Sequence, residues 1–265
     1  MGDFSFRAVA TLRSVRLILA EDTRHARTLL DHYEIRTPTS AYHEHNEAKA
    51  TPRIVERLQS GDDIALISDA GTPLLSDPGG RLVAAAVAAD VPVVPIPGAS
   101  ALLAALAASG LPADRFVFYG FLPRKGKERA VTLDEIAASP YTSILYEAAN
   151  RVAATLRDLA ERAGQRAAVV GRELTKKFEE FNRGTVNSLS AYYNEAAPRG
   201  EVVLMVAGAE SPEPDEDAWR ADASALRSRG MSVRDVAAEL ARRGVPRNVA
   251  YRMAREAKAD MGHGT

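Results

Sequence analysis

The fold of this chain is decided by residues 64–79, IALISDAGTPLLSDPG. The apolar run 64–67 gives way at once to a loop of glycine, proline, serine and aspartate, and a helical pattern follows over 81–89. This order predicts a buried parallel strand that ends in a ligand-binding loop at the start of a helix. The loop matches neither the dinucleotide fingerprint nor the P-loop, because no Lys-Ser/Thr pair follows a glycine run. The alternative is a tight connection that binds no ligand.

Around this stretch, short apolar runs alternate with helical patterns from residue 5 to residue 110. The expected helices cover 5–14, 24–33, 52–60, 81–89 and 100–109, and the expected strands cover 17–20, 40–42, 64–67 and 91–96. Such alternation predicts a parallel sheet with helices on both faces. We therefore expect an α/β domain over residues 1–113.

A second α/β domain is expected over residues 114–209. Its strands are predicted at 116–119, 142–146, 167–172 and 202–206, with helices at 128–138 and 151–162. Residues 178–185 lack a helical period and are predicted to form an antiparallel strand. The acidic, proline-containing residues 210–217 are typical of a solvated linker.

The last segment, residues 218–265, is expected to be a small helical domain with a helix-turn-helix-like layout. Ser232 is placed to cap one helix, Gly244 to end it, and Pro246 to begin the next. Arginines on the final helix favour either contact with RNA or a small packing or dimerisation bundle.

Composition excludes several classes of protein. The chain has 265 residues, 46% of them hydrophobic, a net charge of −1 and no cysteine. Disulfides, thiolate metal sites and cysteine nucleophiles are therefore excluded, and any basic surface must be local. No apolar run reaches membrane-spanning length and the N-terminus has no hydrophobic signal core, so we expect a soluble, cytoplasmic protein without membrane partners.

Polar motifs follow three of the expected strands. They are EDTRH at 21–25, HEHNE at 43–47 and PGAS at 97–100. Ligands of parallel sheets gather at the carboxyl ends of strands, so these motifs are expected to line one cleft together with the 68–79 loop. His43 and His45 suggest a metal site, but no third histidine lies nearby. We expect polar lining of a substrate cleft and no metal.

The second domain adds two charged stretches. Residues 172–180, RELTKKFEE, mix cations with carboxylates at a strand end, where a general base or a phosphate clamp is expected. The alternative is a solvated charged face. Residues 121–129, FLPRKGKER, form a basic loop that suits a polyanion.

Taken together and in this order, the motifs resemble those of the tetrapyrrole methylase superfamily. The 68–79 loop marks the superfamily, while EDTR at 21–24 and RELTK at 172–176 resemble its bacterial ribosomal RNA methylating branch. The resemblance covers about residues 3–258 and implies two α/β domains with a cleft between them, plus the C-terminal helices. It implies transfer of a methyl group from S-adenosylmethionine to the ribose 2′-hydroxyl of a decoding-centre cytidine in 16S rRNA, by a homodimer.

The resemblance also implies residue roles. It places the cofactor against Ser68, Asp69, Ala70, Gly71, Thr72, Pro73, Asp77, Pro97, Gly98, Ala99 and Ser100. A ribose hydroxyl is a poor nucleophile and needs help with its proton, for which the candidates are Glu21, Asp22, Glu173 and Lys176. The candidate RNA-binding residues are Arg24, His43, His45, Arg124, Lys125, Lys127, Arg129, Arg247 and Arg252.

Two further readings stay open, a tetrapyrrole carbon methylase and a non-catalytic RNA-binding assembly factor. The basic loop and the basic C-terminal helices disfavour the first. Members of the superfamily begin with an apolar strand and a Thr-Pro-x-Gly-Asn-Leu-type loop, which have no counterpart after Met1. That strand is central to the first sheet, so we expect this polypeptide alone to be poorly stable and weakly active.

Overall fold

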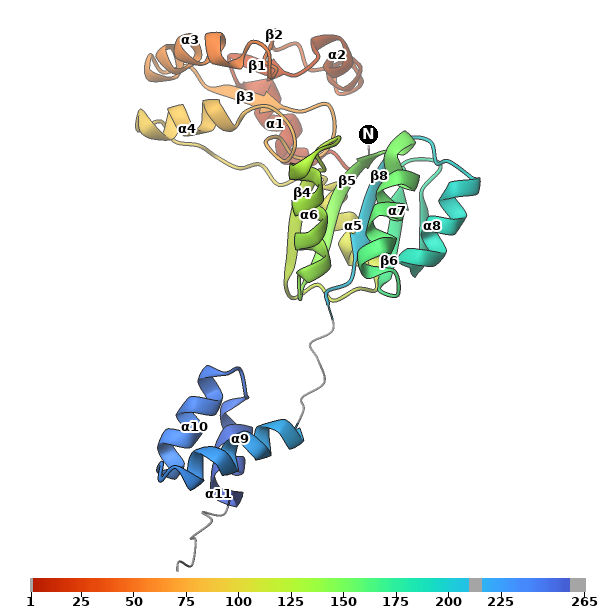
Figure 1. Cartoon of the computed structure of the whole chain (residues 1–265). Helices are drawn as coiled ribbons and strands as arrows, with labels where there is room; N and C mark the ends of the chain where they lie inside the picture. Colours follow the sequence, from red (N-terminus) through yellow and green to blue (C-terminus); the bar gives the residue numbers. More distant parts are fainter. Residues whose placement is uncertain (1, 210–215, 258–265) are drawn as a thin grey trace, which may run out of the picture. The chain divides into compact units, whose positions relative to one another are not determined.

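The computed structural model describes residues 2–209 and 216–257 (Figure 1). The chain divides into two compact units, Met1–Ala209 and Glu210–Thr265. The first unit contains two β-sheets with their helices, and the described part of the second contains helices. Within the described residues, no helix is long and apolar enough to cross a membrane.

The first sheet is parallel, with strand order β2 (Thr39–Ala41), β1 (Leu17–Ala20) and β3 (Ile64–Ile67). Alternate residues of β1 point to opposite faces, so Leu17 and Leu19 lie in one core cluster and Ile18 and Ala20 in another. The helices of these two clusters are α1 (Phe6–Ser14) and α2 (Thr23–His32) on one face, and α3 (Glu47–Gln59) and α4 (Gly80–Ala88) on the other. The predicted parallel sheet with two covered faces is confirmed.

The strand predicted at 91–96 is wrong. Residues 91–100 carry no secondary structure, and Val93 and Val94 are 46% and 73% exposed. In the described part of the chain, β3 pairs with β1 and has no ladder on its other side. A β-branched run forms a strand only where a neighbouring strand supplies hydrogen bonds, and among the described residues no strand pairs with this run.

The second sheet is mixed, with strand order β4-β5-β8-β6-β7. Its strands are β4 (Phe116–Phe121), β5 (Thr142–Ala148), β6 (Ala167–Arg172), β7 (Glu180–Thr185) and β8 (Glu201–Val206). β4 pairs parallel with β5, and the other pairs are antiparallel, as predicted for the 178–185 segment. A short 3-10 turn, η1 (Ala149–Arg151), follows β5. One face is covered by α6 (Lys127–Ala138), α7 (Val152–Ala163) and α8 (Val186–Glu195).

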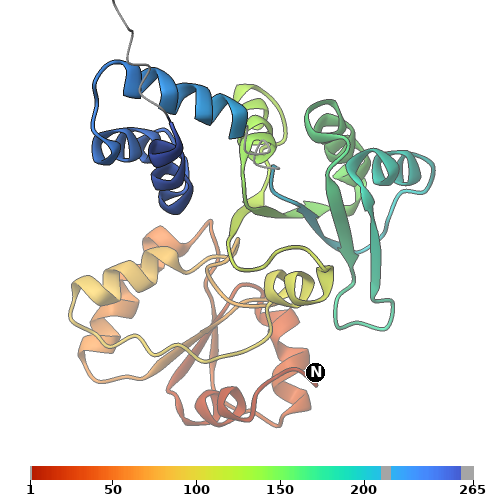
Figure 2. The ribbon, with the colours of Figure 1, turned by 90° about the horizontal axis from the view of Figure 1, so that it is seen from below.

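The other face of the second sheet is covered by α5 (Ala101–Ser109), which precedes that sheet in the chain (Figures 1 and 2). Leu102, Ala105 and Leu106 of α5 are buried in one cluster with residues of β5, β6 and β8. The chain therefore joins the second sheet before residue 101, although the sequence suggested a boundary at residue 113.

In the second unit, α9 (Glu216–Ser228), α10 (Val233–Arg242) and α11 (Arg247–Glu256) share one apolar core. The Ser232 hydroxyl accepts a hydrogen bond from the Asp235 amide, and Gly244 has a φ of 95°, so the predicted cap and helix end are confirmed. Of the predicted linker, residues 210–215 lie outside the described residues, and Glu216 already begins α9.

Candidate functional site

The loop between β3 and α4, residues 68–79, is built on an unusual backbone. Two non-glycine residues, Leu74 and Ser76, have φ values of 74° and 69°, and Gly71 and Gly79 have φ values of 70° and 128°. A φ of 128° favours glycine at position 79, and a Cβ there would also lie 2.5 Å from Leu66 Cδ2, so that the leucine side chain would have to move. Positive φ at bulky residues costs free energy and concentrates at ligand sites.

This loop is joined to the segment 97–100. The Thr72 hydroxyl donates to the Ala99 carbonyl at 3.0 Å, and the Ser5 hydroxyl donates to the Pro97 carbonyl at 3.2 Å. Ser100 accepts from the Leu103 amide and caps α5. Two segments that are distant in the sequence thus form one wall, at the carboxyl end of β3.

A cavity of about 300 Å³ lies against this wall, which is at the small end of the range for small-molecule sites. Its lining includes the predicted residues Ser68, Asp69, Ala70, Gly71, Thr72, Pro73, Pro97, Gly98 and Ala99. Asp77 and Ser100 are not part of this lining. Sequence reasoning missed Phe4, Ser5 and Thr175, which also line it. Nothing local marks Phe4 and Ser5 at the N-terminus, whereas Thr175 belongs to the RELTK motif at 172–176 in the second sheet, which was the signal for it.

A second cavity of about 300 Å³ shares Ser68 and Asp69 with the first and adds His25. His25 Nδ1 lies 3.5 Å from Asp69 Oδ2, and Asp69 Oδ1 accepts from the Asp22 amide at 3.3 Å. His25 was given no role of its own from the sequence, although it is the last residue of EDTRH. Its place in the EDTRH motif was the signal that it belongs to the site.

Glu21 and Asp22 follow β1 but have different surroundings. Burial and the neighbouring Asp69 raise the pKa of Glu21, against an opposing effect of His43. Asp22 caps α2 through the amides of Arg24 and His25 and pairs with the Arg24 guanidinium at 3.0 Å. The hydrogen bonds from Arg24 lower the pKa of Asp22 to about 2. Glu21 is therefore the stronger base of the two.

Asp77 is the most perturbed carboxyl of this group. Burial and the nearby Glu21 raise its pKa to about 6, while a hydrogen bond with Ser68 opposes the shift. Asp69 and Glu201 add smaller repulsions. Carboxyls from both sheets therefore repel one another electrostatically in this part of the first unit. Such repulsion is typical of a site that binds cations or transfers protons.

The second sheet contributes the turn after β6. Glu173 and Thr175 have positive φ values of 49° and 61°, so this turn is strained like the 68–79 loop. Glu173 Oε1 accepts from the Glu201 amide and from Lys176 Nζ, both at 3.0 Å. A Cβ on Gly200 would lie 2.3 Å from Glu173 Oε1, so the carboxylate needs the glycine beside it.

These contacts shift the pKa values of Glu173 and Lys176 so that both side chains keep their charges. The Glu201 amide and Lys176 lower the pKa of Glu173. Burial lowers the pKa of Lys176, but its bonds to Glu173 and Glu201 outweigh burial and raise it overall. Lys176 thus keeps its proton and is poorly suited to act as a base, although it can hold a negative group.

The candidate RNA-binding residues divide into accessible and engaged groups. Arg124, Lys125 and Lys127 are exposed, and within the described residues none has a recorded side-chain partner. Arg129, in contrast, is 11% exposed at its side chain and pairs with Asp158 at 2.8 Å. Arg129 is therefore unavailable to a nucleic acid, contrary to prediction. Because Phe121 belongs to β4 and α6 begins at Lys127, the basic loop itself is the shorter segment 123–127.

The remaining candidates are scattered. His43 and His45 follow β2, with ring centroids 6.0 Å apart, and His43 Nδ1 is buried with no hydrogen-bond partner among the described residues. Among the described residues, no three His, Cys, Asp or Glu side chains are grouped to hold a metal ion. Arg247 and Arg252 lie on α11 in the second unit, where Arg252 donates to Glu216 at 3.1 Å.

Comparison with known proteins identifies the family. Residues 1–190 match the family described as Tetrapyrrole (Corrin/Porphyrin) Methylases. The chain is 46% identical to the Synechocystis protein named ribosomal RNA small subunit methyltransferase I, over 98% of this chain and 95% of that one. It is 44% identical to the protein of the same name from Pseudomonas aeruginosa, over 96% and 92% of the two chains.

Solved structures share the fold at low sequence identity. Diphthine synthase matches with a TM-score of 0.60 and 14% identity, over 78% of this chain and 85% of that one. Uroporphyrin-III C-methyl transferase from Thermus thermophilus, complexed with S-adenyl homocysteine, matches with a TM-score of 0.54 and 17% identity, over 77% and 90%. The chain therefore belongs to the tetrapyrrole methylase family and, within it, to the ribosomal RNA small subunit methyltransferase I group.

Proposed function

We propose that this enzyme transfers a methyl group from S-adenosylmethionine to the ribose 2′-hydroxyl of a decoding-centre cytidine in 16S rRNA. An rRNA methyltransferase is the activity named for relatives that are 44–46% identical over nearly the whole chain. The observation that carries the proposal is the cavity on the 68–79 loop, which also includes Thr175 from the strained turn of the second sheet. Cofactor groups and an acceptor nucleotide can thus meet at one place.

The cavity fits the cofactor. Its walls combine small residues, which leave backbone groups accessible, with apolar side chains such as Phe4, Leu12 and Ile67. Backbone amides and carbonyls suit the polar edges of adenosine, apolar walls suit its rings, and the carboxylate of Asp69 suits a cation. When bound there, S-adenosylmethionine supplies an activated methyl group on a sulfonium ion.

With an activated donor, the residues of the chain mainly align the acceptor. Well-oriented reactants can gain roughly 7–11 kcal/mol from positioning alone. We assign to Glu21 the role of general base that takes the proton of the ribose hydroxyl, because its raised pKa makes it a stronger base than Asp22. Glu173 and Lys176 act as a neutralised pair, in which Lys176 binds a phosphate or orients the acceptor.

Contact with RNA is assigned to exposed cations. Arg124, Lys125 and Lys127 of the basic loop contribute to it, with Arg24 near the cleft. His43 and His45 are assigned to it as polar side chains rather than as charges. Arg247 and Arg252 add contacts from the helical unit. Cations of this kind neutralise phosphates and make binding dependent on salt concentration.

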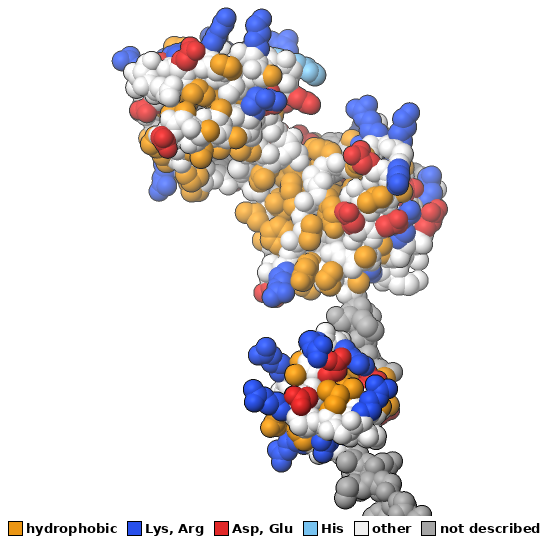
Figure 3. Space-filling view, turned by 60° about the vertical axis from the view of Figure 1, so that its left-hand side comes forward, with side chains coloured by type: hydrophobic (Ala, Val, Ile, Leu, Met, Phe, Trp, Pro, Cys, Tyr) orange, Lys and Arg blue, Asp and Glu red, His pale blue; other side chains and the backbone are white. Residues whose placement is uncertain are grey.

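We also propose a homodimer working in the cytoplasm, where ribosomal subunits are assembled. The first unit exposes large apolar side chains, among them Leu74, Leu75, Val93, Val94 and Phe121. Figure 3 shows hydrophobic side chains across one face of this unit. Apolar surface of this extent is typical of an interaction face. Sedimentation equilibrium should give twice the chain mass of 28.5 kDa.

The test is a methyl-transfer assay with labelled S-adenosylmethionine and small ribosomal subunits. Digestion of the RNA to nucleosides should place the label in 2′-O-methylcytidine. Label on a base would contradict the ribose 2′-hydroxyl as the acceptor. No label in RNA while uroporphyrinogen is methylated would favour the tetrapyrrole reading instead. A chain that binds subunits but not S-adenosylmethionine in calorimetry would be an assembly factor.

The role of Glu21 is tested by Glu21→Gln, with Glu44→Gln as the matched control on a neighbouring exposed loop. Loss of a general base lowers kcat about 10²–10⁴-fold and leaves the affinity for S-adenosylmethionine unchanged. Equal activity of the two variants would remove Glu21 from the mechanism.

A further inference from the structure

The basic loop is exposed, yet its start is fixed to the protein interior. At its start, the Leu122 side chain is 2% exposed, and Arg151 Nη2 donates to the Leu122 carbonyl at 2.8 Å. The Pro123 carbonyl accepts from Arg151 Nη2 at 3.3 Å and from Arg129 Nη1 at 3.2 Å. Each of these donors is an arginine that points away from solvent.

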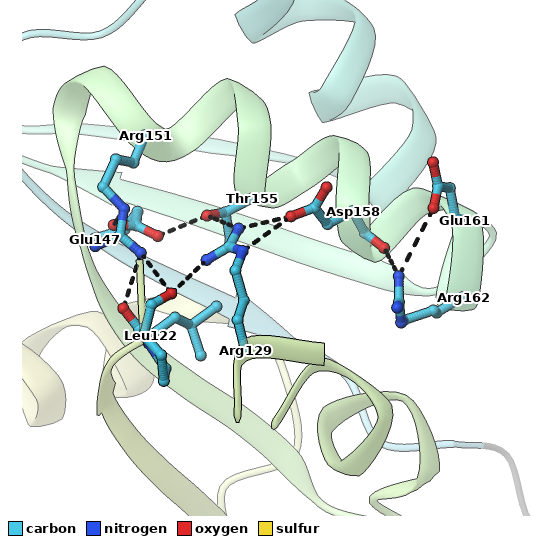
Figure 4. A network of polar contacts seen from close by, with 9 residues as sticks. Leu122, Arg129, Glu147, Arg151, Thr155, Asp158, Glu161 and Arg162 are labelled. Atoms are coloured by element: carbon cyan, nitrogen blue, oxygen red, sulfur yellow. Dashed lines mark hydrogen bonds and ion pairs between the residues drawn. The ribbon is translucent and has the colours of Figure 1, made fainter. Parts of the chain in front are cut away.

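Glu147 connects the two arginines (Figure 4). It lies near the end of β5, and its side chain has no exposed area. Oε1 lies 3.2 Å from Arg151 Nε and accepts from the Ala148 amide at 2.9 Å. Oε2 accepts from the Thr155 hydroxyl at 2.6 Å. Thr155 Oγ1 in turn accepts from Arg129 Nη2 at 3.0 Å.

The network therefore has two arms that start at one buried carboxylate. One arm runs through Arg151 to the carbonyls of Leu122 and Pro123. The other runs through Thr155 and Arg129 to the carbonyl of Pro123. Both end on the backbone at the start of the basic loop, and Arg129 also stands in α6 immediately after it.

A buried ion pair is a poor device for stability, because the loss of hydration offsets most of its attraction. The core around it is otherwise apolar, with Leu145, Val152 and Leu156 fully buried. A buried polar network can instead specify one geometry of the chain. Here the geometry that it specifies is the path of the basic loop. The loop cations themselves take no part in the network.

We propose that Glu147 is a positioning residue for RNA. It holds the basic loop, through Arg151, Thr155 and Arg129, in the path that brings Arg124, Lys125 and Lys127 against the rRNA phosphates. This inference rests on the proposed rRNA contact of the basic loop. The loop also begins near the cofactor side of the unit, since a Cβ on Gly120 would lie 3.1 Å from Ser76 Oγ.

The first test uses Thr155→Val, which keeps the side-chain shape but removes the hydroxyl that joins Glu147 to Arg129. The control is Asp134→Asn, which breaks the Arg162–Asp134 pair (2.7 Å) between α6 and α7 without touching the loop. Thr155→Val should raise KM for small ribosomal subunits roughly tenfold or more, while kcat and the Kd for S-adenosylmethionine stay unchanged. Asp134→Asn should leave all three constants unchanged.

The second test is a double-mutant cycle with Arg124→Ala/Lys125→Ala/Lys127→Ala. If the network acts through the loop, Thr155→Val adds no further rise in KM once the loop cations are gone. The slope of log affinity against log salt should also fall by about 1–2 in Thr155→Val. Glu147→Gln, checked for folding by its melting temperature, should repeat both results.

The outcomes separate two failures. Additive effects of Thr155→Val and the loop variant, or equal effects of Thr155→Val and Asp134→Asn, would overturn the positioning role while leaving the loop as an RNA contact. A loop variant with the normal KM and salt slope would overturn the assignment of the basic loop to RNA, and with it this inference.

Discussion

Two loops of the first unit serve the proposed reaction, and they are held in different ways. The 68–79 loop is shaped by its own backbone, with four residues at positive φ, and a Cβ on one of them, Gly79, would displace Leu66. The basic loop has one residue at positive φ, Gly126 at 88°, and side chains from β5, η1, α6 and α7 fix its start. The first loop must approach a small molecule closely, whereas the second must keep its cations free for a polymer.

The comparison predicts that the largest loss of stability follows removal of Glu147, the buried carboxylate that holds the start of the basic loop. Glu147→Ala leaves Arg151 partly buried without its partner carboxylate, which costs about 3–5 kcal/mol of folding free energy. Urea unfolding followed by circular dichroism measures this loss. A loss below about 1 kcal/mol would show that Arg151 does not need the Glu147 carboxylate to offset its burial.

The 68–79 loop should be most sensitive at Gly79. Gly79→Ala places a Cβ 2.5 Å from Leu66 Cδ2 at a φ of 128°, and we expect a loss of about 2–3 kcal/mol together with weaker S-adenosylmethionine binding. Gly61→Ala is the control, because Gly61 also has positive φ but nothing lies within 4 Å of its Cβ position. Equal losses in the two variants would show that the contact with Leu66 has no role.

The raised pKa of Asp77 predicts that this carboxyl lowers the folding stability as the pH rises. Its pKa of about 6 in the folded protein lies above the ordinary 3.8, so its favourable contribution is present below about pH 4 and lost as the pH rises through about 6. Asp77→Asn should therefore be more stable than the parent at pH 8 by roughly 2 kcal/mol, after allowance for solvent screening. The difference should vanish near pH 4 in thermal melts. A constant difference across this range would contradict the raised pKa.

The smallest effect is expected at the exposed pair beside the network. Asp134 is 67% exposed at its side chain, and Asp134→Asn should change the folding free energy by less than about 0.5 kcal/mol. Urea unfolding in low and high salt measures it. A loss as large as that of Glu147→Ala would remove the distinction between buried and exposed pairs on α7.

Local sequence was sufficient where one segment carries its own signal. The apolar run before the 68–79 loop predicted β3, and Ser232 predicted a helix cap. The cavity-lining residues 68–73 and 97–99 were also recognised, although their role towards the cofactor stays a prediction. α8 was missed, although Val186, Leu189 and Tyr193 have helical spacing.

Other features depend on partners that the local sequence does not reveal. Residues 91–96 have the composition of a strand but no paired neighbour. Arg129 has the charge of an RNA ligand, yet Asp158 and Thr155, nearly thirty residues away, take up its guanidinium. Glu147 lies next to the predicted end of its strand, and only the approach of α7 shows why a carboxylate is buried there.

The packing of α5 limits how this protein can be divided. A fragment ending at residue 113 would carry Leu102, Ala105 and Leu106 with no sheet to cover them, and a fragment starting at 114 would expose the matching apolar face of β5, β6 and β8. Separate expression of the two halves at that point should give aggregation-prone polypeptides. A cut at the extended residues 91–96 would leave the helix with the sheet it belongs to.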